Sequence, residues 1–163
     1  MSRGEASGPG RKRPDIMVRR PGFLVRRLHQ IFVSIYFQTC GRFGTTPVQS
    51  SIMQVLNSQP GIDQAALAAE IGLDRTTTSN VLSRLEARRI VRREVHPDDR
   101  RTKQAFLTSQ GKTLLLGMQD AIEEAHGQLM GPLNRDERKL FLSLLLRLVE
   151  ENNDKGRSAL SWF

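Results

Sequence analysis

The stretch "IGLDRTTTSNVLSRLEARRIVRREVHPDDRRTKQAFLT", residues 71–108, decides the expected fold. A tight turn at Gly72 separates a short apolar helix from a second helix that Asp74 can cap. Two β-prone runs, at 90–95 and 104–107, then flank a charged tip. The stretch therefore predicts a helix-turn-helix followed by a β-hairpin with a long loop.

The second of these helices has an unusual polar face, opposite its apolar positions. A run of threonines disfavours a helix, because β-branched side chains lose χ1 freedom there. Small hydroxyl side chains nevertheless fit close to bases in the major groove, where Asn can bond to adenine and Arg to guanine. We expect this face to bind double-stranded DNA, although a plain solvated face is the alternative. Its residues are Arg75, Thr76, Thr77, Thr78, Ser79, Asn80 and Arg84.

The tip of the hairpin places acidic residues directly before basic ones. A hairpin beside a recognition helix can reach the minor groove, where inserted arginine is favoured. We expect Asp99 to accept the guanidinium of Arg101 and fix its direction, so that Arg101 can enter the groove. Arg100 and Lys103 are expected to contact phosphate.

Helical apolar stripes and cap residues predict five helices besides the second helix of this stretch. Helices are expected from Pro21 to about Cys40, from a Thr46–Gln49 capping box to before Pro60, from Asp63 to Gly72, from a Thr108 cap to Gly131, and after an Asn134 cap with Glu137. The order ααααββαα is mainly α with a small β-hairpin wing. It predicts a winged helix-turn-helix DNA-binding domain joined to a helical dimerisation domain.

The expected division of the chain follows composition and pattern. Residues 1–20 form a basic arm that we expect to be disordered, and 152–163 form a tail. Residues 46–108 are the winged helix-turn-helix domain, and 21–45 with 109–151 are the helical dimerisation region. A homodimer is expected because the stripes of these long helices exceed what one wing domain can cover.

Composition narrows the class of protein. The 163 residues carry 25 Lys+Arg against 17 Asp+Glu, a net charge of +8, which favours nucleic acid or another anionic partner. A run of ~18 apolar residues is lacking, so no membrane association is expected. The lone Cys40 suits a reducing cytoplasm. The three histidines lack metal-ligand spacing, and no catalytic motif occurs, so we expect neither an enzyme, nor a metal site, nor a cofactor.

Residues 67–111, "LAAEIGLDRTTTSNVLSRLEARRIVRREVHPDDRRTKQAFLTSQG", resemble the core of the multiple antibiotic resistance regulator (MarR) family of winged-helix repressors. The family's D-x-R wing pattern falls on Asp99 and Arg101, and its LTxxG helix start on 107–111. The resemblance implies a bacterial, cytoplasmic, homodimeric regulator that binds a palindromic operator and is released by a small effector. The family usually has Gly where Arg89 stands. If that residue is left-handed, Arg costs ~1 kcal/mol, which favours a different helix end here.

The segments "RPGFLVRRLHQI" and "TPVQ…DQAALAAEIGLDR" are similar to a branch of that family that controls the breakdown of aromatic or heteroaromatic acids, including nicotinate-type compounds. The first long helix carries a matching line of residues at helical spacing: Arg26, His29, Phe32 and Tyr36. The rings could stack on an aromatic carboxylate while Arg26 or His29 holds the acid. In the alternative, the rings are dimer core and Arg26 faces water.

Three other interpretations remain open. A coenzyme A thioester is a second possible effector, with its phosphates at Arg19 and Arg20. The chain could instead sense oxidants through Cys40, although a position near a helix C-terminus opposes a thiolate and favours a buried structural thiol. A DNA-binding protein without any effector is the third interpretation.

Overall fold

The computed structural model of the chain describes residues 15–99 and 101–162. Most of the expected basic arm therefore lies outside the described residues. The elements are α1 (Asp15–Val18), α2 (Pro21–Cys40), the 3-10 turn η1 (Gly41–Phe43), α3 (Pro47–Ser58), β1 (Ile62–Asp63), α4 (Gln64–Ile71), α5 (Arg75–Ala87), β2 (Val91–Val95), β3 (Lys103–Leu107), α6 (Ser109–Met130), α7 (Arg135–Glu150) and the 3-10 turn η2 (Asn153–Lys155).

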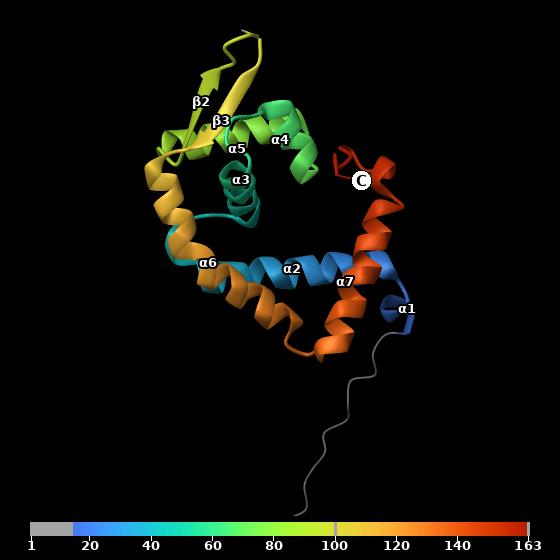
Figure 1. The fold of residues 1–163 in the computed structure, drawn as a ribbon. Coiled ribbons are helices and arrows are strands. Elements are labelled where there is room, and N and C mark those ends of the chain that lie inside the picture. Colours follow the sequence, from blue (N-terminus) through green and yellow to red (C-terminus); the bar gives the residue numbers. More distant parts are fainter. Residues whose placement is uncertain (1–14, 100, 163) are drawn as a thin grey trace, which may run out of the picture.

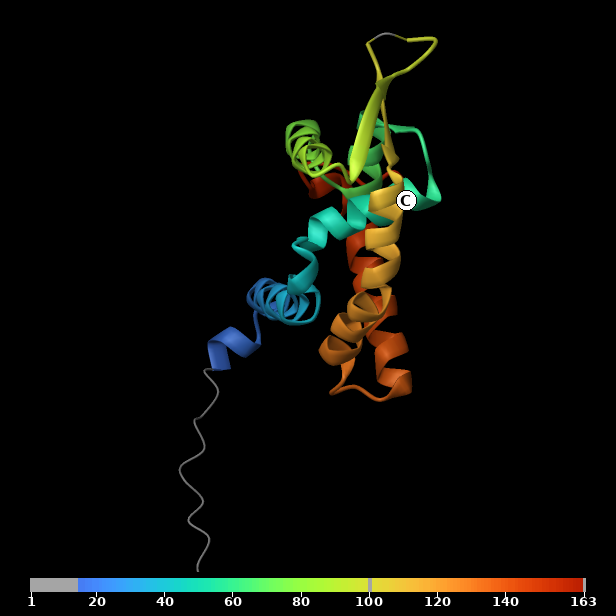
Figure 2. The same cartoon turned by 90° about the vertical axis from the view of Figure 1, so that its left-hand side faces the viewer.

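The expected mainly helical fold with a hairpin wing is confirmed. In Figure 1, α3, α4, α5 and the sheet form one end of the molecule, and α2 and α6 form the other. Figure 2 shows the β2–β3 hairpin projecting beyond α5. None of the described helices combines the length and the apolar character that a membrane crossing needs.

The sheet has one strand more than the sequence predicts. Its order is β1-β3-β2, and the two residues of β1 pair with β3 through Ile62 opposite Ala105 and Asp63 opposite Gln104. A two-residue strand shows no alternation, so the pattern could not reveal it. The extra pairing anchors β3 to the start of α4 and covers the inner edge of the wing.

Side-chain caps define the helix starts as expected. Thr46 accepts a hydrogen bond from the backbone of Gln49, and the Gln49 side chain accepts one from the backbone of Thr46, which completes a capping box. Asn134 and Glu137 form the second box. The single-residue caps are Asp63, Asp74 and Thr108. These caps fix where the loops end and therefore where helices such as α5 begin.

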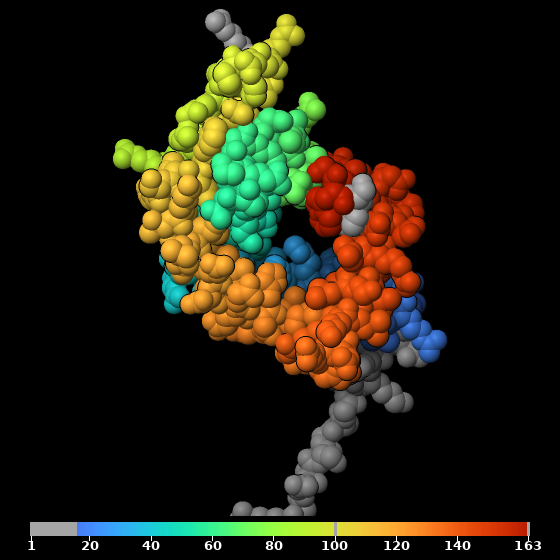
Figure 3. All heavy atoms as spheres, in the orientation of Figure 1, coloured from blue at the N-terminus to red at the C-terminus, as the bar shows by residue number. Residues whose placement is uncertain are grey.

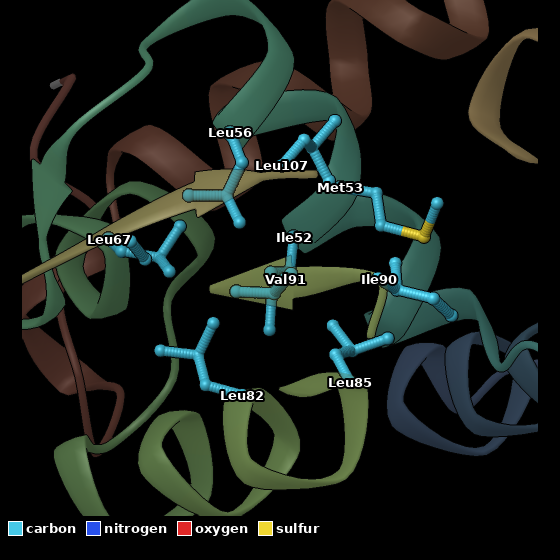
Figure 4. Packing of buried hydrophobic residues seen from close by; sticks show 10 residues of the cluster. Ile52, Met53, Leu56, Leu67, Leu82, Leu85, Ile90, Val91 and Leu107 are labelled. Atoms are coloured by element: carbon cyan, nitrogen blue, oxygen red, sulfur yellow. The ribbon is translucent and has the colours of Figure 1, made fainter. Parts of the chain in front are cut away.

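Two apolar cores organise the chain. The larger one joins α3, α4, α5 and the sheet (Figure 4), and its members include Ile52, Met53, Leu56, Leu67, Leu82, Leu85, Ile90, Val91 and Leu107. The smaller one lies between α2 and α6 and contains Tyr36, Cys40 and Met118. Leu114 and Leu115 of α6 pack against both cores, so α6 connects them.

Helix α7 contributes to neither core. None of its 16 residues is buried. Its leucines are unusually exposed for an amphipathic helix, with Leu140 at 59% and Leu148 at 58%. Burial of one leucine is worth about 1.5–3 kcal/mol, so such a face is expected to be covered in the working assembly.

Three residues, Arg89, Thr108 and Gly111, shape the place where the end of α5, the start of β2 and the start of α6 meet. Arg89 has φ 59°, and its backbone N–H bonds to the carbonyl of Glu86 at 2.8 Å. The expectation that Arg in this place changes the helix end is therefore wrong: the left-handed turn is kept. The Thr108 hydroxyl donates to the carbonyl of Arg89 at 2.6 Å. At Gly111, a Cβ would lie 2.2 Å from the Ile90 carbonyl oxygen, so α6 can start here only with glycine.

Replacing Arg89 with glycine should stabilise the protein. A left-handed conformation strains a residue with a Cβ by about 1–2 kcal/mol, and greater freedom of glycine in the unfolded chain offsets part of this gain. We expect Arg89→Gly to raise the free energy of unfolding by about 0.5–1 kcal/mol in urea titrations. The matched control is Arg84→Gly inside α5, which should lower it by about 1 kcal/mol. Equal losses in both variants would contradict this assignment.

Candidate nucleic-acid interface

The start of α5 is held by its cap. Asp74 accepts the Thr77 backbone N–H at 2.8 Å and the Thr77 hydroxyl at 2.6 Å. These bonds, the hydroxyl first, hold the pKa of Asp74 below its ordinary value. The capped turn presents Arg75 and Thr76 to solvent at the N-terminal end of the helix, the end by which recognition helices contact bases.

The side chains of the predicted polar face reach the surface at every position except one. Arg75, Thr76, Asn80 and Arg84 are exposed, and Thr77 and Ser79 are half-buried, whereas Thr78 has no exposed surface. The prediction that Thr78 contacts DNA is wrong, because it lies at helical spacing with Leu82 and Leu85 on the core side. Its hydroxyl donates to the Asp74 carbonyl at 3.0 Å, which satisfies the polar group without water.

Arg93 of β2 joins the recognition helix to the wing. Its guanidinium donates to the carboxylate of Glu86, to the Ser83 hydroxyl at 3.1 Å and to the Gln64 side chain at 3.4 Å. The Arg93 side chain is 15% exposed and that of Glu86 is 39% exposed, so only the arginine end of this pair is shielded from water. Hydrogen bonds from Arg93 hold the pKa of Glu86 below its ordinary value. Three elements, α4, α5 and β2, are thereby fixed relative to one another.

Both faces of the wing carry further basic residues. Arg92 lies over the Phe106 ring at 4.2 Å and pairs with Glu94. Lys103 is exposed and lies opposite Val95 in the hairpin register. The two strands are therefore paired as far as Val95 and Lys103, where the loop begins.

The loop at the wing tip is organised differently from the prediction. Asp99 accepts the Arg101 backbone N–H at 2.9 Å and the Thr102 hydroxyl at 2.8 Å. The expected bond to the Arg101 guanidinium is wrong, because an Asp two residues ahead closes an Asx-turn on the backbone instead. These bonds lower the pKa of Asp99. Arg101 is exposed; Arg100, predicted to contact phosphate, lies outside the described residues.

The structure separates the α2 residues that were predicted to bind the effector: some are buried and others are exposed. Tyr36 is 2% exposed, its hydroxyl lies 2.9 Å from that of Thr45, and burial raises its pKa. Arg26 and His29 are exposed, and Arg26 lies over the Phe23 ring at 5.5 Å. Only Phe32 has both buried and exposed surface. A core tyrosine cannot line a surface with Arg26 unless the chain rearranges.

The structure adds residues that the pattern of α2 did not reveal. His126 of α6 stacks on Phe32, with ring centroids 5.2 Å apart and an angle of 27°. Only the packing of α2 on α6 brings these two rings together, so no local signal could identify His126. A separate cavity of about 320 Å³ lies between α3 and α6, lined by Gln54, Asn57, Lys112 and Glu123 among others.

The described residues give little support for a metal site or for a redox-active cysteine. They contain no group of three His, Cys, Asp or Glu that could hold a metal ion. Cys40 is a free thiol with no exposed surface, and the Thr39 hydroxyl lies 3.5 Å from its sulfur. A thiol without exposed surface is poorly placed to meet an oxidant, so the structure does not favour the redox interpretation.

A capped polar helix beside an arginine-bearing hairpin, on one shared core, defines a winged-helix transcriptional regulator. Residues 43–102 match a model of the MarR family. The chain is 31% identical over 107 residues to the transcriptional regulator HosA of Escherichia coli, covering 64% of this chain and 77% of that protein. The chain belongs to the MarR family and is a MarR-type transcriptional regulator, not an enzyme.

Two further relatives resemble a larger part of the chain. The HTH-type transcriptional repressor NicR of Pseudomonas putida is 28% identical over 151 residues, which are 93% of this chain and 96% of that protein. The solved structure of Bordetella bronchiseptica BpsR, whose DNA binding is regulated by 6-hydroxynicotinic acid, is 28% identical with a TM-score of 0.76. The match covers 80% of this chain and 93% of BpsR.

Acid should loosen the junction of α5 and the wing. A carboxylate with a depressed folded-state pKa adds stability above its unfolded pKa, near 4.5 for Glu86, and this stability is lost as pH falls through the folded value. We expect Glu86→Gln to cost about 1 kcal/mol at neutral pH and to lose less stability than wild type below about pH 4.5. Urea titrations along a pH series test this. Glu150→Gln, at the exposed end of α7, is the control; parallel pH profiles of wild type and Glu86→Gln would refute the assignment.

Proposed function

We propose that this chain is a homodimeric, cytoplasmic repressor of a catabolic operon for an aromatic or heteroaromatic acid. It binds a palindromic DNA operator and is released when the acid binds. The observation that carries this proposal is the rigid pairing of an exposed, capped α5 with the wing through Arg93. A surface held this firmly, with cations along it, suits a large rigid anionic partner such as duplex DNA.

The DNA contacts divide between the two grooves. The start of α5 enters the major groove, where Arg75, Thr76 and Asn80 meet base edges and Arg84 reaches the backbone. Ser79 and Thr77 lie at the margin of this contact. The wing carries Arg101 into the neighbouring minor groove, and Lys103 contacts phosphate, as does Arg100 at the tip.

The second protomer covers the apolar surfaces that one chain leaves open. Helix α7 exposes leucines along its length, and α2 exposes Leu24 at 46% and Val25 at 56%. In Figure 3 a hollow opens between α4, α6 and α7, which a partner's helices can fill. A two-fold dimer presents two copies of α5 to half-sites roughly 34–36 Å apart, one turn of the duplex.

The effector assignment draws on chemistry and on relatives. BpsR responds to a heteroaromatic acid. In this chain the Phe32–His126 stack offers an aromatic platform, and His29 and Arg26 follow along α2 towards its N-terminus. A cation can hold the carboxylate by a charge-assisted bond, about twice as strong as a neutral one. A coenzyme A thioester, with its phosphates at Arg19 and Arg20, is the other ligand class to test.

Substitutions of two neighbouring aspartates distinguish the effect of the wing turn on operator binding from the effect of negative charge. Asp99→Ala opens the turn, so it should weaken operator binding although it removes a negative charge. Asp98→Ala removes the same charge outside that turn, and its binding should be unchanged or tighter. Arg101→Ala should lose about 1–3 kcal/mol if the side chain enters the minor groove. Fluorescence titrations with a selected duplex measure all three; tighter binding by Asp99→Ala would overturn the turn's role.

Effector release can be tested with matched ligands and variants. An aromatic acid such as 6-hydroxynicotinate should dissociate the DNA complex in gel shifts, whereas its uncharged amide should do so poorly. Arg26→Ala should abolish release but leave DNA affinity nearly unchanged. Lys112→Ala, in the cavity between α3 and α6, is the comparison: loss of release in this variant alone would move the site there. Release by neither acid, amide nor thioester would leave an effector-independent regulator.

A further inference from the structure

The segment that follows α7 returns to the helix-turn-helix and binds the end of α4. Figures 1 and 3 show it beside α4, on the far side of the molecule from α6. The backbone N–H of Ser161 donates to the carbonyl of Ala69 at 3.0 Å, and the indole N–H of Trp162 donates to the carbonyl of Glu70 at 3.0 Å. The Ser161 hydroxyl lies 3.1 Å from the Glu70 carboxylate.

These contacts supply what the end of a helix lacks. The last carbonyls of an α-helix have no partner within it, and they need donors from elsewhere. Ala69 and Glu70 belong to the last turn of α4, which ends at a left-handed Gly72 with φ 67°. Leu160 packs against that glycine so closely that a Cβ there would lie 3.1 Å from its Cδ2. The segment is therefore fitted to α4 in both polar and apolar contacts.

The segment is itself held in shape by Asn153. The Asn153 side chain donates to the Leu160 carbonyl at 3.0 Å and accepts the Leu160 backbone N–H at 2.8 Å. This two-bond clamp closes residues 153–160 into a loop directly after α7. A contact at α4 is consequently transmitted to α7 through a short closed loop, not through a slack chain.

We propose that residues 153–162 form a strap that ties α4 to α7. The strap thereby sets the distance between the two copies of α5 and its wing in the dimer. The inference rests on the proposed function, in which α7 lies in the dimer interface. Because α4 and α5 share one core, a tether on α4 limits how far α5 can swing relative to that interface. Asn153 and Trp162 are then positioning residues that determine which half-site spacing the regulator accepts.

The test is a spacing series. Wild-type protein first selects a palindromic duplex from a random pool, and its affinity is then measured on versions with the half-sites moved by one or two base pairs. We expect Asn153→Ala to reduce the preference for the selected spacing roughly tenfold, the size expected for losing two hydrogen bonds. Affinity for a single half-site should stay unchanged, which a merely destabilised protein would not show. Trp162→Phe removes the indole donor and should act in the same direction, less strongly.

The adjacent asparagine is a matched control. Asn152 bonds to the Leu148 carbonyl at 2.8 Å and to Lys155, so it contacts α7 and the turn after it but not the returning segment. Asn152→Ala should keep the spacing preference of wild type. Equal preferences in Asn153→Ala and wild type would overturn the strap. Failure of wild type to select any palindrome would instead overturn the proposed function.

A crosslinking experiment tests whether the strap binds α4 of its own chain or α4 of the partner. In full-length Glu70→Cys/Ser161→Cys, a short bismaleimide should join the two cysteines within one chain, because the native side chains are in hydrogen-bond contact. Cys40 is fully buried and should not compete. A denaturing gel should show the mass of one chain, and the intact mass should show one linker with neither introduced cysteine left as a free thiol. A product of two-chain mass, or no crosslink, would overturn the strap within the protomer.

Discussion

The guanidinium of Arg93 is the constraint on which the geometry of this regulator depends. It bonds at once to Glu86 and Ser83 of α5 and to Gln64 of α4, while its backbone pairs in the wing. A single planar cation with several fixed donors can hold three elements at a defined angle, which a lysine could not do. Without it, α5 and the wing would share a core but not a common orientation towards a duplex.

A second arginine connects α5 and the wing to the rest of the chain. Arg88, at the end of α5, donates to the carbonyl of Gly44 at 2.5 Å and to that of Phe43 at 3.2 Å, in the turn that follows α2. Together with α6, which packs on both cores, this contact gives α2 a direct mechanical path to the recognition helix. A ligand or partner that moves α2 can thus change the position of α5, provided that it binds the two positions with different affinity.

Sequence patterns predicted local features, such as helix caps, better than they predicted contacts between distant segments. The caps at Asp74, Thr108 and Asn134 were predictable because they depend on neighbours within three residues. Thr78 could have been placed in the core from its spacing to Leu82, but the polar run concealed it. The Asp99 turn was predicted wrongly because two kinds of donor, the backbone N–H and the guanidinium, compete for one carboxylate. His126 and the role of Arg93 depend on packing between distant segments, which no local pattern contains.

The central claim is that α5 and the wing read DNA as one rigid unit, used twice by a two-fold dimer. Hydroxyl-radical footprinting of a duplex selected by the wild-type protein tests it most directly. Two protected backbone segments roughly 34–36 Å apart, each extending across the minor groove beside it, are the predicted pattern. A single protected segment, or protection spread evenly along the duplex, would contradict the account.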